Sequence, residues 1–315
     1  MDIFWHLLSL TAPLFLLVAI GYALTGWGRW PKSASDALTQ FVFSVAIPAL
    51  LFRLMSDFSR MPPVDPTLLI AYFGGCVLVF VLGRAISYAV FRRDGAAQSV
   101  FALGGMFANT VLLGIPMAKI TLGDASIPAV SLVVVFNSLL LWTLVTLSVE
   151  WARHGAWSWA GFRGTAWGVL KNPVVASILA GTAFSFTGVP LPDMLDQTLL
   201  LMSQAAVPLS LIALGMGLAE YGTREGWQES VAITALKLVA QPAVVWLLAR
   251  VLRLPLLETQ AVVLLAAMPV GANVYLMSRQ FATMQGPVAS SLVLSTALAA
   301  VTTPLILALV AAVTT

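Results

Sequence analysis

Ten apolar stretches of about 20 residues divide this sequence and constrain its fold more than any other feature. Such a stretch is long enough for one helix to cross the hydrocarbon layer of a bilayer. Only 9% of the 315 residues are charged and 60% are hydrophobic, whereas soluble domains carry about 25% charged residues. We therefore predict an all-α membrane protein with ten transmembrane helices, at residues 3–25, 36–56, 67–91, 98–120, 125–150, 165–188, 195–219, 230–252, 258–280 and 287–312.

Lysine and arginine are distributed unevenly among the predicted loops. Ten spans place both termini on one side, where the loops contain five of these residues, against nine on the other side. Because cytoplasmic loops are the richer in Lys and Arg, we predict a multi-pass protein of a bacterial inner membrane with both termini periplasmic. The Trp- and Arg-rich connection 151–164 is expected to lie at the membrane interface.

The fourth predicted span is interrupted by the sequence NTVLLGIP, at Asn109–Pro116. Pro116 has no N–H and clashes with the carbonyl one turn back, so we predict that the helix opens near residue 112. Gly114 would let the opened backbone take unusual angles. Open backbone at membrane depth is tolerated only where it is buried in protein or lines a wet cavity. Asn109 and Thr110 are the polar groups beside this opening.

A second interruption, MPVGAN at Met268–Asn273, falls in the ninth span. Interrupted spans in both halves of a chain point to a transporter binding site. The halves also share landmarks: Pro13, Gly21 and Pro48 recur 160 residues later as Pro173, Gly181 and Pro208. With five spans in each half, the second half must be inserted upside down. Chance matches among Pro- and Gly-rich helices are the alternative explanation.

Five residues are the candidate binding groups: Asn109, Thr110, Asn137, Gly271 and Asn273. Helix N-termini exposed at the two breaks carry partial positive charge, which favours an anionic ligand. The alternative is that each amide only satisfies the backbone of a neighbouring helix. For Asn137, in the middle of the fifth span, the two interpretations are equally supported.

Other residues are assigned conformational or electrostatic roles. Pro116, Gly114 and Pro269 mark the breaks, and Pro48 and Pro208 mark bends that are hinges or simple kinks. Lys237 either extends its amine to the interface or supplies positive charge to an anion pathway.

The sequence lacks the residues that several classes of function require. With His6, His154 and Cys76 as the only His and Cys residues, no metal site is expected. A membrane-embedded enzyme would need a nucleophile–base pair or a metal cluster, so no enzyme is predicted. The small net charge of +3 does not suggest a nucleic-acid partner. No cofactor is predicted, and whether H⁺ or Na⁺ is a coupling ion stays open.

The chain resembles the auxin efflux carrier family, which includes plant auxin carriers and bacterial malonate-transporter-type members. The resemblance rests on NTVLLGIP, on Trp142-Thr143 followed by Glu150, on Lys237 with Pro242, and on MPVGANVYLMSRQF from Met268. It implies two inverted five-helix repeats, 1–155 and 156–315. It also implies a scaffold from spans one, two, six and seven, with a mobile transport domain from the other six.

The resemblance further implies that Asn109 holds the substrate carboxylate beside the crossover of spans four and nine. Asn137 occupies a position that is polar in the plant carriers, whereas Asn273 stands where the plant pattern is more apolar, which favours a smaller, more polar acid. We expect a homodimeric elevator-type carrier of a small organic anion, malonate-like or auxin-like. The rival hypothesis is a membrane sensor or scaffold that binds an organic acid without transporting it.

Overall fold

The computed structural model describes residues 2–27, 30–60, 64–154, 173–219 and 226–314. The predicted interfacial connection 151–164 lies outside the described residues from residue 155 onward. So do residues 165–172 of the sixth predicted span.

All of the described elements are helical. The first half of the chain contains α1 (Asp2–Gly26), α2 (Lys32–Phe41), α3 (Ile47–Met55), α4 (Thr67–Ala89), α5 (Gly95–Met106), α6 (Ile115–Thr121) and α7 (Ile127–His154). The second half contains α9 (Pro173–Ser185), α10 (Asp193–Gln204), α11 (Ala206–Leu218), α12 (Trp227–Ala235), α13 (Gln241–Val251), α14 (Leu256–Ala266), α15 (Ala272–Gln280) and α16 (Gln285–Thr314). Short 3₁₀ turns cover Phe58–Arg60 and Asp124–Ser126.

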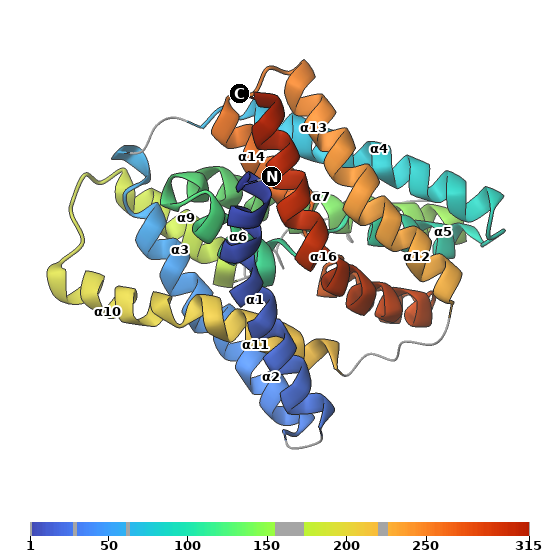
Figure 1. Cartoon of the computed structure of the whole chain (residues 1–315), viewed down its shortest axis with the longest axis horizontal. Helices are drawn as coiled ribbons and strands as arrows, with labels where there is room; N and C mark the ends of the chain where they lie inside the picture. Colours follow the sequence, from blue (N-terminus) through green and yellow to red (C-terminus); the bar gives the residue numbers. More distant parts are fainter. Residues whose placement is uncertain (1, 28–29, 61–63, 155–172, 220–225, 315) are drawn as a thin grey trace.

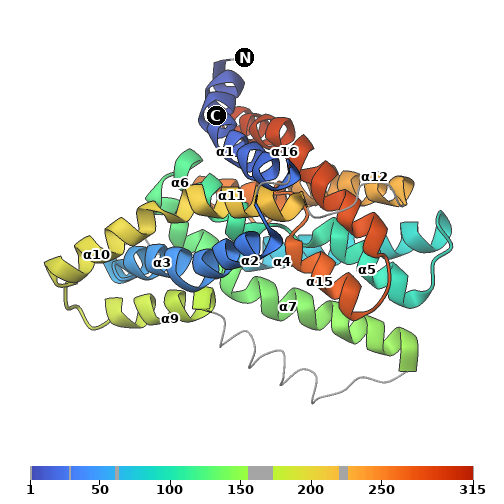
Figure 2. The ribbon, with the colours of Figure 1, turned by 90° about the horizontal axis from the view of Figure 1, so that it is seen from below.

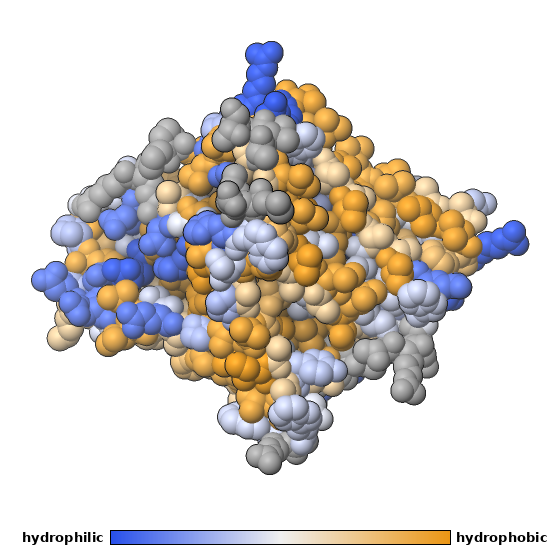
Figure 3. Space-filling model, in the orientation of Figure 1, coloured by the Kyte–Doolittle hydropathy of each residue, from blue (hydrophilic) through white to orange (hydrophobic). Residues whose placement is uncertain are grey.

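Six continuous helical segments within the described residues are long and apolar enough to cross a membrane, and four shorter apolar helices accompany them. Most of the surface in Figure 3 is apolar, with hydrophilic residues gathered toward its edges. A surface of this kind suits a lipid environment, where apolar side chains meet acyl chains instead of water.

Two of the long segments and one of the shorter apolar helices contain a wider, π-helical turn: η1 (Val42–Ala46), η5 (Leu236–Ala240) and, in the shorter helix, η3 (Thr110–Gly114). Each ends two residues before a proline, at Pro48, Pro116 and Pro242. Proline cannot bond the carbonyl four residues back and its ring clashes with it; a π turn moves that carbonyl away. The predicted opening near residue 112 lies at the centre of η3.

The helices form two groups that are each packed internally. In one, α1 packs along α11, and α3 packs against α9 and α10. In the other, α4 packs against α5 and α13, and α16 packs against α12. Figures 1 and 2 show the start of α1 close to the end of α16, where the groups touch.

Two glycines in corresponding places allow close helix contacts within the first group. A Cβ on Gly21 would lie 2.2 Å from the carbonyl oxygen of Ile212, and a Cβ on Gly181 would lie 2.7 Å from that of Phe52. The contacts α1–α11 and α9–α3 are therefore made in the same way. In both, the equivalent residues are 160 positions apart, Gly21 with Gly181 and Phe52 with Ile212.

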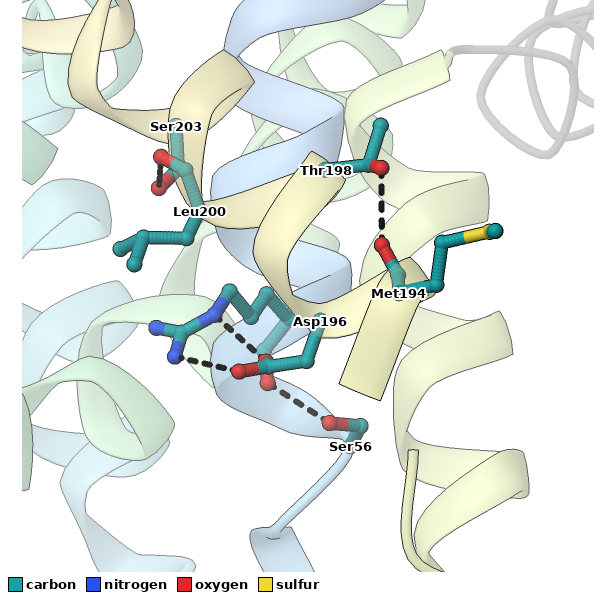
Figure 4. A network of polar contacts seen from close by, with 7 residues as sticks. Ser56, Met194, Asp196, Thr198, Leu200 and Ser203 are labelled. Carbon is teal, nitrogen blue, oxygen red and sulfur yellow. Dashed lines mark hydrogen bonds and ion pairs between the residues drawn. The ribbon is translucent and has the colours of Figure 1, made fainter. Parts of the chain in front are cut away.

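Each group has an arginine–carboxylate ion pair that joins two of its helices near their ends. The Arg53 guanidinium on α3 binds the Asp196 carboxylate on α10 in a bidentate pair, at 2.7 and 3.1 Å. Figure 4 shows Asp196 facing α3, while Thr198 donates to the Met194 carbonyl of its own helix. In the second group Arg93 binds the buried Glu229 at 2.6 Å, and this carboxylate raises the pKa of the Arg93 guanidinium.

Candidate functional site

The two interrupted helices meet through a short pair of extended segments. The Asn109 N–H donates to the Pro269 carbonyl at 2.8 Å, and the Gly271 N–H donates to the Phe107 carbonyl at 2.8 Å. Ala108 and Val270 are thereby paired as in an antiparallel sheet. This pairing satisfies backbone groups that neither broken helix can satisfy by itself, as burial away from water requires.

Local geometry explains the residue types on both segments. Asn109 (φ −76°, ψ 69°) is the centre of an inverse γ-turn, closed by a bond from the Thr110 N–H to the Ala108 carbonyl. A Cβ on Gly271 would lie 2.9 Å from the Ala108 carbonyl oxygen, so only glycine permits this approach.

The expectation that Gly114 adopts unusual backbone angles is wrong. Gly114 has φ −63° and ψ −48°, which are ordinary helical values. Its lack of a side chain matters for packing instead, because a Cβ there would lie 2.9 Å from Cδ2 of Leu265 on α14. The glycine therefore lets the two broken helices lie close together.

Two side chains from a single neighbouring helix close the carbonyl ends of both breaks. The Lys237 amine donates to the Ala266 carbonyl at 2.5 Å, at the end of α14. One turn later, the Gln241 amide donates to the Met106 carbonyl at 2.6 Å, at the end of α5. The interpretation that Lys237 extends to the interface is wrong: its side chain is fully buried. Instead the amine binds the open Ala266 carbonyl, which lies at the negative end of a helix, where a cation is favoured.

Helix α16, the tenth predicted span, makes further contacts at the second break, between α14 and α15. The Ser295 hydroxyl accepts from the Val270 N–H at 3.1 Å, and the Thr303 hydroxyl donates to the Ala267 carbonyl at 3.3 Å. The carbonyl ends of the broken helices are thus occupied by protein donors, while their N-terminal ends face a cavity.

A cavity of about 380 Å³ lies on that N-terminal side. The structure brings all five predicted binding residues to its wall: Asn109, Thr110, Asn137, Gly271 and Asn273. The opposite wall comes from α2 and α11, so the cavity lies where the two helix groups face each other. Lys237 does not line it.

Two amides in this wall have polar atoms without a protein partner. The Asn109 side chain is 6% exposed and Asn137 is 2% exposed. Within the described residues, neither Nδ2 of Asn109 nor Oδ1 of Asn137 has a hydrogen-bond partner. A buried amide without a partner costs free energy, so these two atoms are ready to bind a ligand that enters the cavity.

Residues at the cavity mouth were not among the predicted binding groups. Lys32, Ser35, Asp36 and Thr39 line it from α2, and Tyr275 and Arg279 line it from α15. Lys32 and Arg279 were counted only as loop charges. The signal for Arg279 was its spacing from Ala272 and Leu276, because residues four or seven apart share one face of a helix.

Metal chemistry finds no support in the same region. Across the parts of the chain that the structure describes, no three His, Cys, Asp or Glu side chains are grouped to hold a metal ion. The cavity instead presents amides, hydroxyls, helix N-termini and a few charges at its mouth, which can bind a small polar solute.

A helical membrane protein with two broken helices paired beside a cavity of mixed polar and apolar lining has the architecture expected of a transporter. The comparisons with known proteins agree. The chain belongs to the membrane transport protein family, whose family model matches residues 6–156 and 162–307.

Three relatives illustrate the range of this family. The chain is 27% identical over 299 residues to a protein of Rhizobium meliloti described as "Putative malonate transporter", covering 93% of this chain and 92% of the relative. It is 23% identical to an uncharacterized transporter of Methanocaldococcus jannaschii, covering 81% and 82%. It is 20% identical to auxin efflux carrier component 8 of Arabidopsis thaliana, covering 88% and 90%.

Proposed function

We propose that this protein is a secondary transporter of a small organic anion in a bacterial inner membrane. The observation that carries the proposal is the unpartnered Asn109 Nδ2, which lies beside the helix N-termini at the cavity wall. N–H groups at a helix start favour negative charge, and an amide donates to a carboxylate without the cost of burying a lysine or arginine. The names of the Rhizobium and Arabidopsis relatives are consistent with an organic acid.

The proposed mechanism is an elevator-type movement. The transport domain would contain the predicted spans three, four, five, eight, nine and ten, and the scaffold spans one, two, six and seven. Two packing groups with the cavity between them support this division. A transport domain that slides along the scaffold would expose the same cavity to each side in turn.

The arrangement as two inverted repeats, 1–155 and 156–315, has independent support. Gly21 contacts α11 as Gly181 contacts α3, at one common offset of 160 residues. The turns after α4 and α13 also match, since Arg92 (φ 50°) and Arg253 (φ 54°) both have left-handed backbones. A homodimer formed through the scaffold is part of the proposal and rests on the family resemblance.

The test is uptake of radiolabelled malonate and related acids into proteoliposomes that contain Asn109 variants. Asn109→Ala removes the donor and should lower the initial rate by about tenfold or more, the effect of losing a hydrogen bond to a charged group. Asn109→Asp should be worse than Asn109→Ala, because it places a negative charge beside an anion. Thr198→Ala is the control, since Thr198 bonds only its own helix.

Three outcomes contradict the proposal. Undiminished uptake by Asn109→Ala removes the site assignment, and faster uptake by Asn109→Asp indicates a cationic cargo. Binding of the acid without exchange of labelled substrate across the vesicle membrane favours the rival function, a non-transporting sensor.

A further inference from the structure

Arg279 is the charged residue of the cavity that the proposed anion site leaves unexplained. It lies in the last turn of α15, whose N-cap residue, Gly271, belongs to the paired segments. Ala272, Leu276 and Arg279 line the same cavity, so they form one stripe along the helix. Seven residues separate Ala272 from Arg279, which places the Arg279 Cα about 10 Å along the helix from the break.

The geometry of α15 favours an Arg279 side chain that leads back toward the cavity floor. In an α-helix every Cα–Cβ bond tilts toward the N-terminus, and the N-terminus of α15 is the break itself. This tilt favours side-chain directions that lead from Arg279 back toward the break, and Arg279 lines the same cavity as Asn109 and Asn137. One cavity thus has neutral donors at its floor and a cation above them.

Within the described residues, no charged group at the mouth forms an ion pair with Arg279. Lys32 and Asp36 lie one turn apart on α2, on the opposite wall. Lys32 makes an interaction of its own. Within the described part of the chain, the Arg279 guanidinium has neither an ion pair nor a hydrogen bond. The Arg279 guanidinium therefore has its five donors available to a ligand in the cavity.

We propose that Arg279 binds a second carboxylate and makes the site selective for short dicarboxylates over monocarboxylates. This inference rests on the proposed function: one carboxylate meets Asn109 and the helix N-termini, and the other meets Arg279. A guanidinium suits this role because its planar fork matches a carboxylate with two parallel hydrogen bonds. An acid with one carboxylate would leave the cation without a partner.

The experiment compares acids that differ only in the second charge. Malonate and succinate, each beside its monomethyl ester, are supplied to proteoliposomes that contain the unaltered protein, Arg279→Gln, Arg279→Lys or Arg250→Gln. Arg250 is the control, an exposed arginine near the end of α13 that does not line the cavity.

Arg279→Gln should raise the KM for the diacids by about 10-fold to 100-fold, as expected for losing a hydrogen bond to a charged group. The KM for the monoesters should change by less than about twofold, because they have no second carboxylate for Arg279 to bind. Arg279→Lys should bind the diacids more tightly than Arg279→Gln and less tightly than the unaltered protein, because lysine keeps the positive charge but lacks the planar pair of donors. Arg250→Gln should leave all four values unchanged.

Equal losses for diacids and monoesters, or no loss for either, would overturn the role of Arg279 and leave the proposed transport function intact. Uptake of none of the four acids by the unaltered protein would overturn the proposed function itself, and the dicarboxylate inference with it.

Discussion

At the scale of single residues, the buried side chains of Lys237 and Gln241 are explained by the backbone carbonyls that they satisfy. Lys237 and Gln241 lie one turn apart on the same face of the η5–α13 segment. They donate to the last carbonyls of two different broken helices. The sequence predicted the breaks, but it did not predict these donors. Which helix lies behind a break depends on tertiary packing, so Lys237 was given an interfacial alternative.

Gln241 therefore permits a prediction about stability. Gln241→Leu keeps the volume but leaves the buried Met106 carbonyl without its amide donor, at a cost of about 1–3 kcal/mol. For a chain of this size that cost lowers the apparent melting temperature by a few degrees. Thermal unfolding of the detergent-purified protein measures it, with Gln40→Leu on the exposed face of α2 as the control. A Gln241→Leu protein as stable as the control would show that the Gln241–Met106 bond contributes little.

At the scale of elements, each of the three π segments ends two residues before a proline. The carbonyls of Ser44, Leu112 and Leu238 stand four residues before Pro48, Pro116 and Pro242, at the middle of each π segment. Sequence reasoning could locate these places because the clash is local. It also located the break before Pro269, where α14 ends and α15 begins only at Ala272. Sequence reasoning could not predict the antiparallel pairing of the two breaks, because that contact joins residues about 160 positions apart.

Pro116 gives the prediction at this scale. Pro116→Ala restores a backbone N–H that can bond the Leu112 carbonyl, so η3 can tighten into an α-helix. Tightening rotates Asn109 relative to α6 and should lower the initial uptake rate by about tenfold, since a small misplacement at a site has such an effect. Pro13→Ala is the control, because α1 continues through Pro13 without interruption. Equal rates for the two variants would contradict this account of η3.

At the scale of the whole molecule, the two helix groups and the cavity between them define what must move. The cavity has its floor at the paired segments and its mouth at Lys32, Asp36 and Arg279. Those charges stand on the side that the Lys and Arg distribution predicts to be cytoplasmic. This sidedness stays a prediction, and it rests on loop composition alone. Sequence reasoning could not predict which side the cavity faces, because that depends on how the two groups are packed.

Together these observations predict an arrangement that is open to the cytoplasm, and thiol labelling tests it. Thr187 and Ser33 are exposed and lie on opposite predicted sides, in the α9–α10 turn and the first turn of α2. A membrane-impermeant maleimide should label Thr187→Cys in intact cells and Ser33→Cys only in inside-out vesicles. The unaltered protein is the unlabelled control, since Cys76 is its one cysteine and is fully buried. The reverse pattern would place both termini in the cytoplasm and open the cavity to the periplasm, because the lysine and arginine bias would then have given the wrong orientation.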